Sequence, residues 1–496
     1  MNQCNINLLD LPTEILLTIF KKLDNMDVLY SLFDINNQRL DNIIQENTFT
    51  NTLNFVLTTL TNDFLSISDP ILDRFCTNIL PKIHYNVKSL ILNSLSMERI
   101  LLVADYSNLC EIKIFNFNIQ SPCRRLFQRQ ITDLILVFEN YVNEISCKHY
   151  TTDSFPSLVL RNLPITTCYS STLSKLCINV IYYDDLLDLL DGRLKQLHTL
   201  RVVIINQEYN STNVYNINNL SDLKYFYLQY DCLTDTYNSQ ILPLLRRMSN
   251  IEVLNLHLTM DNQTTFIDGK HIYNEIIVHM SRLHTFNFCF CTFIPLDHLF
   301  KDDILQIFPS IIYQQVDCMI EYQDVDVKYH VFTLPFMFDY LPYIDNTFPN
   351  IIFNHVIRLV IEDEISLEHE FFMRIVRSFP LLKILHVINL MPQSPISNEL
   401  DSNDNELYST IIKFPYLTTL NLQYAYPDYI EQFLNDKKTH LPYLTKLTVG
   451  YYELKSVTRN FTNDRTRLNC MKVKQLNMSP KMSIHSEDFY AYSPSL

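Results

Sequence analysis

The sequence predicts an α/β protein in which a short helical unit precedes a long array of strands, loops and helices. Three observations support this prediction. Apolar residues recur at helical spacing within residues 1–46. A pattern Φ-x-x-Φ-x-Φ, where Φ is apolar, then recurs along the rest of the chain. The hydrophobic share of 47% is that of a chain that folds around a core.

The composition excludes several classes of function. Lys and Arg total 39 and Asp and Glu total 54, so the net charge is −15 and the chain repels phosphate backbones. Glycine occurs only at Gly192, Gly269 and Gly450. Dinucleotide fingerprints, P-loops and nucleophile elbows need glycine-containing turns. We therefore expect no catalytic residue, no cofactor and no nucleic-acid partner.

The cysteines and the apolar segments predict a reduced protein that does not enter a membrane. Twelve cysteines are scattered without a C-x-x-C motif, and the close pair Cys289 and Cys291 lacks further ligands at zinc spacing. The N-terminus has no basic region followed by a continuous apolar run, and no segment approaches 18 apolar residues. We expect a cytoplasmic or nuclear location, no metal site and no membrane contact.

Residues 1–46 are predicted to form three helices. Pro12 and Glu14 suit a helix start, and Asp27 is placed to cap a second helix. A third helix follows around Leu40. A unit of this size buries too little surface to be stable alone. It must therefore dock either onto the rest of this chain, as a cap, or onto a partner.

The segment from Leu11 to Leu23, LPTEILLTIFKKL, followed by Asp27-Val28-Leu29, resembles the F-box. The family pattern is roughly L-P-x-E-[IL]-[IL]-x-x-[IL]-[FL]-x-x-L, a short gap, then D-[LV]-[LI]. The chain departs from the family in the third helix, where Leu40 follows Arg39 at a place that usually holds an aromatic residue. The resemblance covers about a tenth of the chain.

The resemblance implies a partner for this unit. F-box proteins bind the small adaptor of the SCF ubiquitin ligase, which links them to a cullin scaffold. The residues implied for adaptor binding are Leu11, Pro12, Leu16, Phe20, Leu23, Val28 and Leu29. Ile15 and Ile19 are expected instead to hold the three helices together.

The repeated apolar pattern predicts fourteen strands. From residue 87 to residue 283 its first positions recur at intervals of 18 to 32 residues, which is similar to the leucine-rich repeat. The expected strands are 87–92, 109–114, 131–136, 155–160, 173–178, 197–202, 223–228, 251–256, 283–288, 356–361, 382–387, 417–422, 444–449 and 473–478. Helices are expected between them at 97–103, 184–190, 241–248, 270–280, 367–378 and 428–434.

The predicted fold class is α/β, with an N-terminal three-helix F-box at 1–46, a mostly helical linker at 47–86 and an irregular leucine-rich-repeat-like α/β solenoid, or horseshoe, at 87–496. The repeats are irregular because the Asn or Cys that usually follows the strand is mostly missing. The interval after residue 283 is too long for one repeat. It allows a hidden strand at 308–313 and a hairpin insertion at 315–345, where residues 324–331 alternate.

Residues that flank the core positions of each strand are expected to face outward from the concave surface. They are Lys113, Arg161, Arg201, Tyr225, Tyr227, Gln229, Asn255, His257, Asn287, His386, Asn421, Gln423 and Lys446. The candidates for substrate binding among them are Arg161, Arg201, Tyr225, Tyr227, Asn255, His257 and His386. The alternative is a solvated face without function.

Two main hypotheses follow for the function, and a third, an enzyme with a dispersed site in the solenoid, is disfavoured by the three glycines and the lack of a catalytic motif. The first is a non-catalytic substrate-recognition subunit of an SCF-type ubiquitin ligase, which binds the adaptor through residues 1–46 and an unknown protein substrate through the solenoid. Such a subunit acts by raising the effective concentration of substrate lysines near activated ubiquitin. The second is an interaction scaffold whose F-box-like unit is only a structural cap, with no ubiquitin role.

Overall fold

The chain folds as a mixed α/β protein with a large, mostly parallel sheet, as predicted. The computed structural model describes residues 10–58, 64–116, 131–137, 170–192, 194–205, 222–234, 236–260, 267–295, 301–308, 315–322, 326–394 and 410–480, together with Phe489 and Tyr492. Within these residues the strands form one sheet of eleven strands, one of six and two pairs.

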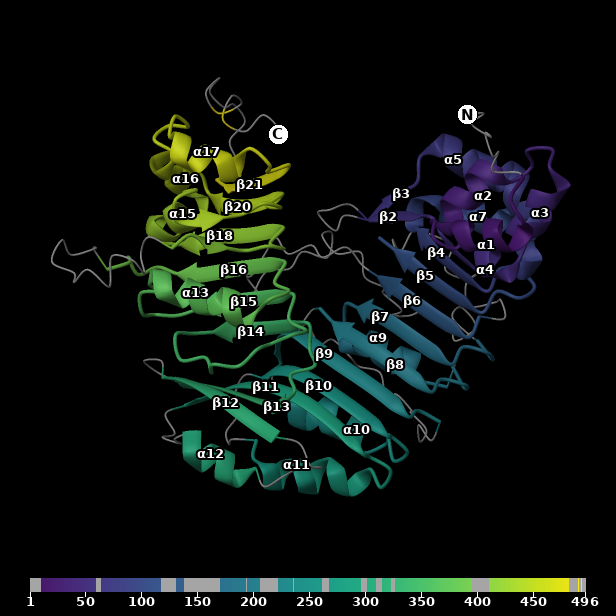
Figure 1. The fold of residues 1–496 in the computed structure, drawn as a ribbon. Coiled ribbons are helices and arrows are strands. Elements are labelled where there is room, and N and C mark those ends of the chain that lie inside the picture. The colour runs from purple at the N-terminus through teal and green to yellow at the C-terminus, as the bar shows by residue number, and fades with distance from the viewer. Residues whose placement is uncertain are drawn as a thin grey trace.

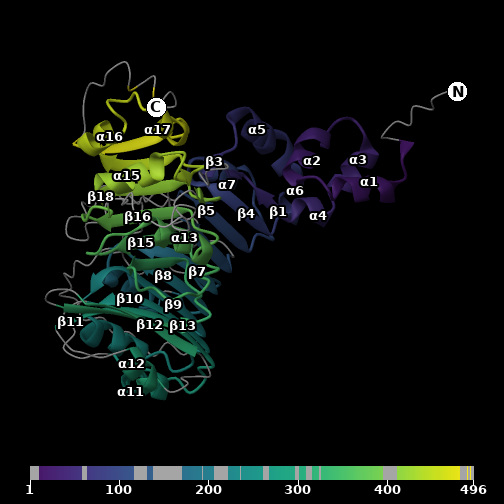
Figure 2. The ribbon, with the colours of Figure 1, turned by 60° about the vertical axis from the view of Figure 1, so that its left-hand side comes forward.

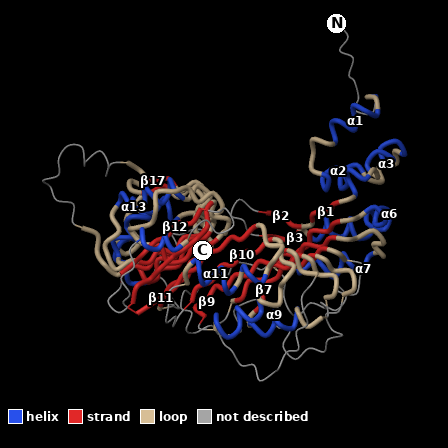
Figure 3. Tube along the Cα trace, turned by 90° about the horizontal axis from the view of Figure 1, so that it is seen from below, coloured by secondary structure: helices blue, strands red, loops and turns tan. Residues whose placement is uncertain are grey.

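Four short helices lie at the N-terminus: α1 (Thr13–Phe20), α2 (Asn25–Leu32), α3 (Gln38–Ile44) and α4 (Asn47–Thr50). The predicted three-helix start is confirmed, although the cap of α2 is Asp24 rather than Asp27. The Asp24 carboxylate accepts the Met26 N–H, which satisfies a backbone donor that the first turn leaves unpaired. Asn37 caps α3 in the same way. These helices project beyond the end of the strands (Figure 2; Figure 3).

The eleven-stranded sheet has the order β1-β4-β5-β6-β7-β8-β9-β10-β11-β13-β12. Its strands from β1 to β11 are parallel neighbours, and β13 and β12 close the sheet as an antiparallel hairpin. The strands are β1 (Thr52–Asn54), β4 (Ser89–Asn93), β5 (Glu111–Phe115), β6 (Asp133–Val137), β7 (Lys175–Val180), β8 (Thr199–Ile204), β9 (Tyr225–Thr234), β10 (Val253–Met260), β11 (Thr285–Pro295), β12 (Gln315–Tyr322) and β13 (Asp326–Leu334).

The six-stranded sheet is parallel throughout, in the order β14-β15-β16-β18-β20-β21. Its strands are β14 (Tyr340–Ile344), β15 (Arg358–Glu362), β16 (Ile384–Asn389), β18 (Thr419–Ala425), β20 (Lys446–Gly450) and β21 (Gln475–Ser479). The short strands β17 (Ile412–Lys413) and β19 (Thr439–His440) pair in parallel beside it. The two sheets form the two arms of a U, with the chain ends at opposite tips (Figure 1).

Helices connect many of the strands, which is the arrangement that parallel pairing requires. In the first arm they are α7 (Ser94–Val103), α9 (Tyr183–Leu189), α10 (Leu242–Leu245), α11 (Gly269–Glu275) and α12 (Lys301–Ile307). In the second arm they are α13 (His369–Ser378), α15 (Pro427–Leu434), α16 (Tyr451–Val457) and α17 (Asp464–Cys470). Each of the six helices expected between strands is therefore matched by a helix at its place.

Thirteen of the fourteen expected strands are present. The remaining one, at 155–160, lies outside the described residues, as do residues 309–313 of the expected hidden strand at 308–313. At the place of the allowed hairpin insertion, β12 and β13 pair as antiparallel strands. The apolar strand residues that point away from the concave side, such as Leu90, Ile112 and Leu200, are fully buried.

The prediction of a mostly helical segment at 47–86 is wrong in its first half. β1 pairs with β4 and starts the large sheet, and β2 (Val56–Thr58) with β3 (Phe64–Ser66) forms an antiparallel pair. The second half is helical, with α5 (Asp69–Arg74), a π-helical turn and α6 (Leu80–Ile83). A short apolar run of this kind is compatible with either a helix or a strand. Leu53 and Phe55 are fully buried, so tertiary packing decides in favour of a strand.

Candidate functional site

The N-terminal helices bury most of the residues that the sequence assigned to adaptor binding. Leu16, Phe20, Val28 and Leu29 are at most 2% exposed and form the core between the helices. Their assignment to a partner surface is therefore wrong. Leu11 is partly buried against the same core. Only Pro12 and Leu23 of the predicted set are exposed.

An apolar stripe runs along the outer side of α1 and the turn after it. It consists of Pro12, Ile15, Ile19 and Leu23, and we call it the α1 stripe. Ile15, Ile19 and Leu23 are 46%, 37% and 55% exposed. The spacing of four residues places Ile15 and Ile19 on one face of α1, with Pro12 just before the helix and Leu23 in the turn after it. The expectation that Ile15 and Ile19 hold the helices together is therefore wrong.

The third helix completes the core without the usual aromatic residue. Leu40 is 1% exposed and packs in the same core as Ile43 and Ile44. Arg39, beside it, donates from Nη2 to the Leu11 carbonyl oxygen and from Nε to Thr13 Oγ1 at 3.1 Å. Leu40 thus fills its place, and Arg39 ties the third helix to the start of α1.

The helical unit is attached to the large sheet through the helices that follow α1. Asn25 Nδ2 donates to the carbonyl oxygens of Phe49 and Thr52, and Arg74 Nη2 donates to the Phe33 carbonyl oxygen at 3.0 Å. Lys82 pairs with Asp34 at 3.0 Å. These contacts cap the N-terminal end of the sheet and leave the α1 stripe exposed.

The predicted substrate-binding residues of the central strands are buried. Tyr227, Asn255 and His257 are 6%, 5% and 2% exposed. The cause is the segment between β13 and β14, which crosses their face of the sheet. The Phe338 ring lies 5.0 Å from the His257 ring and 5.9 Å from the Tyr227 ring, and the Tyr340 ring lies 5.5 Å from His257. These three residues form an internal interface and not a free surface.

Three other candidates, Tyr225, Arg201 and Arg161, differ in their surroundings. Tyr225 is 36% exposed and lies at the start of β9. Arg201 is half-buried, lies over the Tyr227 ring at 4.3 Å and pairs with Asp339 at 3.3 Å. Arg161 lies outside the described residues. Of the wider outward-facing set, Gln229, Asn287 and Asn421 are also buried, whereas Lys113, Gln423 and Lys446 are half-exposed.

His386 is buried within the six-stranded sheet, contrary to its prediction as a surface residue. It is 1% exposed, and its Nδ1 lies 3.5 Å from Nδ2 of Asn421 on the neighbouring strand. Burial, with a smaller contribution from the Arg358 charge, lowers the pKa of His386 to about 3. His386 is therefore neutral at physiological pH and serves the interior of the sheet.

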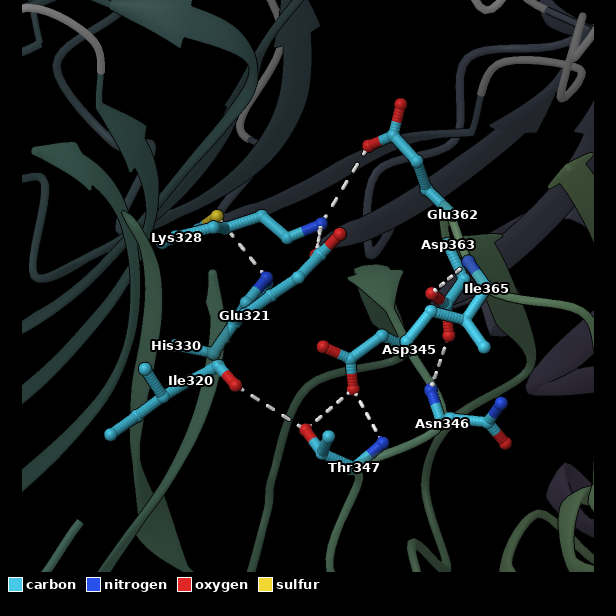
Figure 4. A network of polar contacts seen from close by, with 11 residues as sticks. Ile320, Glu321, Lys328, His330, Asp345, Asn346, Thr347, Glu362, Asp363 and Ile365 are labelled. Carbon is cyan, nitrogen blue, oxygen red and sulfur yellow. Dashed lines mark hydrogen bonds and ion pairs between the residues drawn. The ribbon is translucent and has the colours of Figure 1, made fainter. Parts of the chain in front are cut away.

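A buried polar network joins the two sheets where the hairpin meets β15 (Figure 4). Lys328 on β13 is 1% exposed and pairs with Glu321 on β12 and, at 3.7 Å, with Glu362 on β15. Burial opposes the Lys328 charge, but Glu321 and then Glu362 outweigh it, so the pKa of Lys328 is raised. The charged lysine thereby links one sheet to the other.

Further contacts belong to the same junction. Thr347 Oγ1 donates to the Asp345 carboxylate at 2.6 Å and lies 3.5 Å from the Ile320 carbonyl oxygen. Cys291 Sγ lies 3.2 Å from His330 Nε2, and both residues are buried. Burial, then the charge of Lys328, holds the pKa of His330 well below its usual range. A neutral histidine and a thiol whose pKa is raised by burial do not form a reactive pair.

Comparisons with known proteins add no family to these findings: no family model matches the chain, and no curated protein matches it. Over the residues described by the structure, no helix has both the length and the apolar character needed to cross a bilayer. The assignment of the site therefore depends on the geometry of the N-terminal helices and on their sequence.

One signal in the sequence pointed to the α1 stripe. Five of the eight residues of α1 are apolar, which is more than one buried face of a surface helix requires. The surplus indicates a second contact surface. The burial of Tyr227 and His257 had no comparable local signal, because the residues that cover them lie far along the chain.

Proposed function

We propose that this chain is a non-catalytic substrate-recognition subunit of an SCF-type ubiquitin ligase, with residues 1–46 as its F-box and the curved array that follows as a leucine-rich-repeat-like solenoid. The α1 stripe is the observation that carries the proposal. The helices already have a complete core, and the rest of the described chain leaves the stripe exposed. An apolar stripe at helical spacing is a surface suited to a partner protein.

The proposed role requires no chemistry on this chain. The adaptor would bind on the α1 stripe and bring the cullin scaffold with it, and a protein substrate would bind on another surface. A rigid junction between the two sheets suits this role, because it fixes the distance between adaptor and substrate. The location that this role implies is the cytoplasm or the nucleus.

A second candidate is favoured by the attachment of α2–α4 to β1. The hydrogen bonds of Asn25 and Arg74 make these helices a cap on the sheet, which is the role that they would have in an interaction scaffold without a ubiquitin function. The two candidates differ in whether the α1 stripe binds the adaptor.

Co-expression with the SCF adaptor, followed by co-purification, separates the two candidates. We expect the chain to retain the adaptor and the variant Ile15→Asp/Ile19→Asp/Leu23→Asp to lose it, because three charges replace the apolar contact. A control, Leu95→Asp/Leu102→Asp/Ile365→Asp, changes side chains at least 57% exposed elsewhere and should retain the adaptor. Phe20 is buried, so its substitution would test folding and not docking.

A folded chain that purifies alone contradicts the receptor proposal and favours the scaffold. Equal retention by the stripe variant and the wild type also contradicts it. Circular dichroism of all three proteins establishes that the stripe variant is folded. This check makes a loss of the adaptor attributable to the surface itself.

A further inference from the structure

The six-stranded sheet carries a row of exposed side chains just before its strands. Backbone hydrogen bonds fix the register: the N–H groups of Lys383, Thr418, Thr445 and Lys474 each donate, at 2.8–2.9 Å, to the preceding strand at equivalent carbonyl oxygens. The residues two places earlier therefore lie at equivalent positions in the turns that precede neighbouring strands. With the two strands before them, they are Met337, His355, Leu381, Tyr416, Tyr443 and Lys472.

All six of these residues are exposed, and we call the row the edge ladder. Its centre is apolar: Leu381, Tyr416 and Tyr443 are 44%, 50% and 40% exposed. The residue that follows each of the three, a leucine, is at most 3% exposed and anchors the turn in the core. The turns are thus rigidly held while their apolar side chains face solvent.

Around five of the six ladder residues, from His355 to Lys472, the charge is the reverse of that of the chain; beside the sixth, Met337, lies Asp339, which pairs with Arg201 at 3.3 Å. The segments 349–358, 377–384, 411–419, 437–446 and 470–475 hold nine Lys and Arg residues and no Asp or Glu, in a chain of net charge −15. The basic residues are Arg358, Arg377, Lys383, Lys413, Lys437, Lys438, Lys446, Lys472 and Lys474. Glu431 reaches in from α15 and pairs with Lys438 at 3.6 Å.

Among the residues that the structure describes, the eleven-stranded sheet has no such surface at the same register position. The equivalent residues there are polar: Asn86, Asn108, Thr172, Gln196, Asp222, Asn250 and Arg282. Charges of both signs accompany them, as in the pair between Lys224 and Glu252 at 3.2 Å. The apolar and basic character of the edge ladder is therefore specific to the second sheet and is not imposed by the turn.

We propose that the edge ladder binds an acidic peptide segment of a partner protein, with its apolar side chains on Leu381, Tyr416 and Tyr443 and its carboxylates among the flanking lysines. Aromatic side chains with basic neighbours supply both contact area and charge complementarity. A long polyanion such as a nucleic acid or an anionic membrane would extend past the ladder and meet the acidic remainder of the chain. A short acidic segment fits within the basic region.

The test is a binding titration of the full chain by fluorescence anisotropy. The probe is a labelled peptide in which glutamate alternates with leucine and phenylalanine. A control peptide has glutamine in place of every glutamate. We expect the acidic peptide to bind, and raised salt to weaken it, because the charges are at the surface. The glutamine peptide should bind at least about tenfold more weakly, a difference of about 1.4 kcal/mol.

Two variants separate the apolar and the charged parts of the ladder. Leu381→Asn/Tyr416→Asn/Tyr443→Asn and Lys413→Glu/Lys472→Glu/Lys474→Glu should each weaken the acidic peptide about tenfold. The control Lys88→Glu/Lys195→Glu/Arg282→Glu makes the same charge change on the first sheet and should leave affinity within about twofold. All substituted residues are exposed, and thermal melting verifies that each variant is folded.

Three results would overturn the proposal: no binding of the acidic peptide, equal binding of the glutamine peptide, or equal weakening by the control variant. Tighter binding of a single-stranded oligonucleotide or of anionic vesicles than of the peptide would also overturn it. The ladder is independent of the function proposed for α1. The variant Ile15→Asp/Ile19→Asp/Leu23→Asp should therefore bind the peptide as the wild type does.

Discussion

The two sheets are built from the same repeated unit of turn, parallel strand and connection. They differ in the type of residue in that turn, at the position of the edge ladder, two residues before the first hydrogen-bonded N–H of each strand. In the eleven-stranded sheet that residue is polar and often bonded within the fold, as when Asn86 Nδ2 donates to the Gln45 carbonyl oxygen at 3.0 Å. In the six-stranded sheet it is apolar at Leu381, Tyr416 and Tyr443. The difference shows that the turn accepts either a polar or an apolar residue at this position. The residue type is therefore not dictated by the turn itself.

The largest effect is expected where the two sheets are joined. Replacing Lys328 by Met leaves the buried Glu321 carboxylate without its cation, which should cost about 3–5 kcal/mol of unfolding free energy. The double variant Lys328→Met/Glu321→Gln removes both charges and should recover most of that loss. Urea unfolding measures both values. A loss below about 1 kcal/mol in the single variant would show that the pair does not hold the junction.

A smaller effect is expected from acid, and its contribution from the six-stranded sheet should come from His386. Because the pKa of folded His386 is about 3, the unfolded chain binds a proton between about pH 6.5 and pH 3 that the folded chain does not. Stability is therefore present above pH 6.5 and falls as the pH is lowered, by about 2 kcal/mol at pH 5.

The variant His386→Gln isolates that contribution. It should flatten the decline between pH 7 and pH 5, leaving the parts that arise from His330 and His271, whose pKa values are lowered in the same direction by burial. Urea titrations at the two pH values, with hydrogen exchange of the β16 amides, measure the change. An unaltered slope in the variant would contradict the burial of a neutral His386.

The smallest changes in unfolding free energy are expected at the turn residues that precede the strands. They test the contrast between the two sheets. Asn86→Leu removes a partly buried hydrogen bond and should cost about 1 kcal/mol. Leu381→Asn, Tyr416→Asn and Tyr443→Asn alter exposed side chains and should each change stability by less than about 0.5 kcal/mol. A larger cost in the ladder variants would mean that the ladder stabilises the fold and is not held for a partner.

Local periodicity located thirteen of the fourteen strands and the six helices that it predicted, but it missed β1, β2 and β3 in the segment expected to be helical. It also predicted the helix over α1 but not its outer face. Leu16 and Ile15 are adjacent and equally apolar, and only the packing of α2 and α3 decides that Leu16 is buried. The burial of Tyr227 and His257 could not be predicted from the local sequence. Phe338 and Tyr340, which cover them, lie far along the chain.

The crossing of Phe338 over the central strands has a consequence during synthesis. The parallel strands up to β11 leave the ribosome before the segment that covers Tyr227 and His257 has been made. Until then, a nascent chain carries an uncovered aromatic and histidine face in an otherwise formed sheet. That face is covered only after the segment between β13 and β14 has emerged, so the start of the second sheet completes the packing of the first.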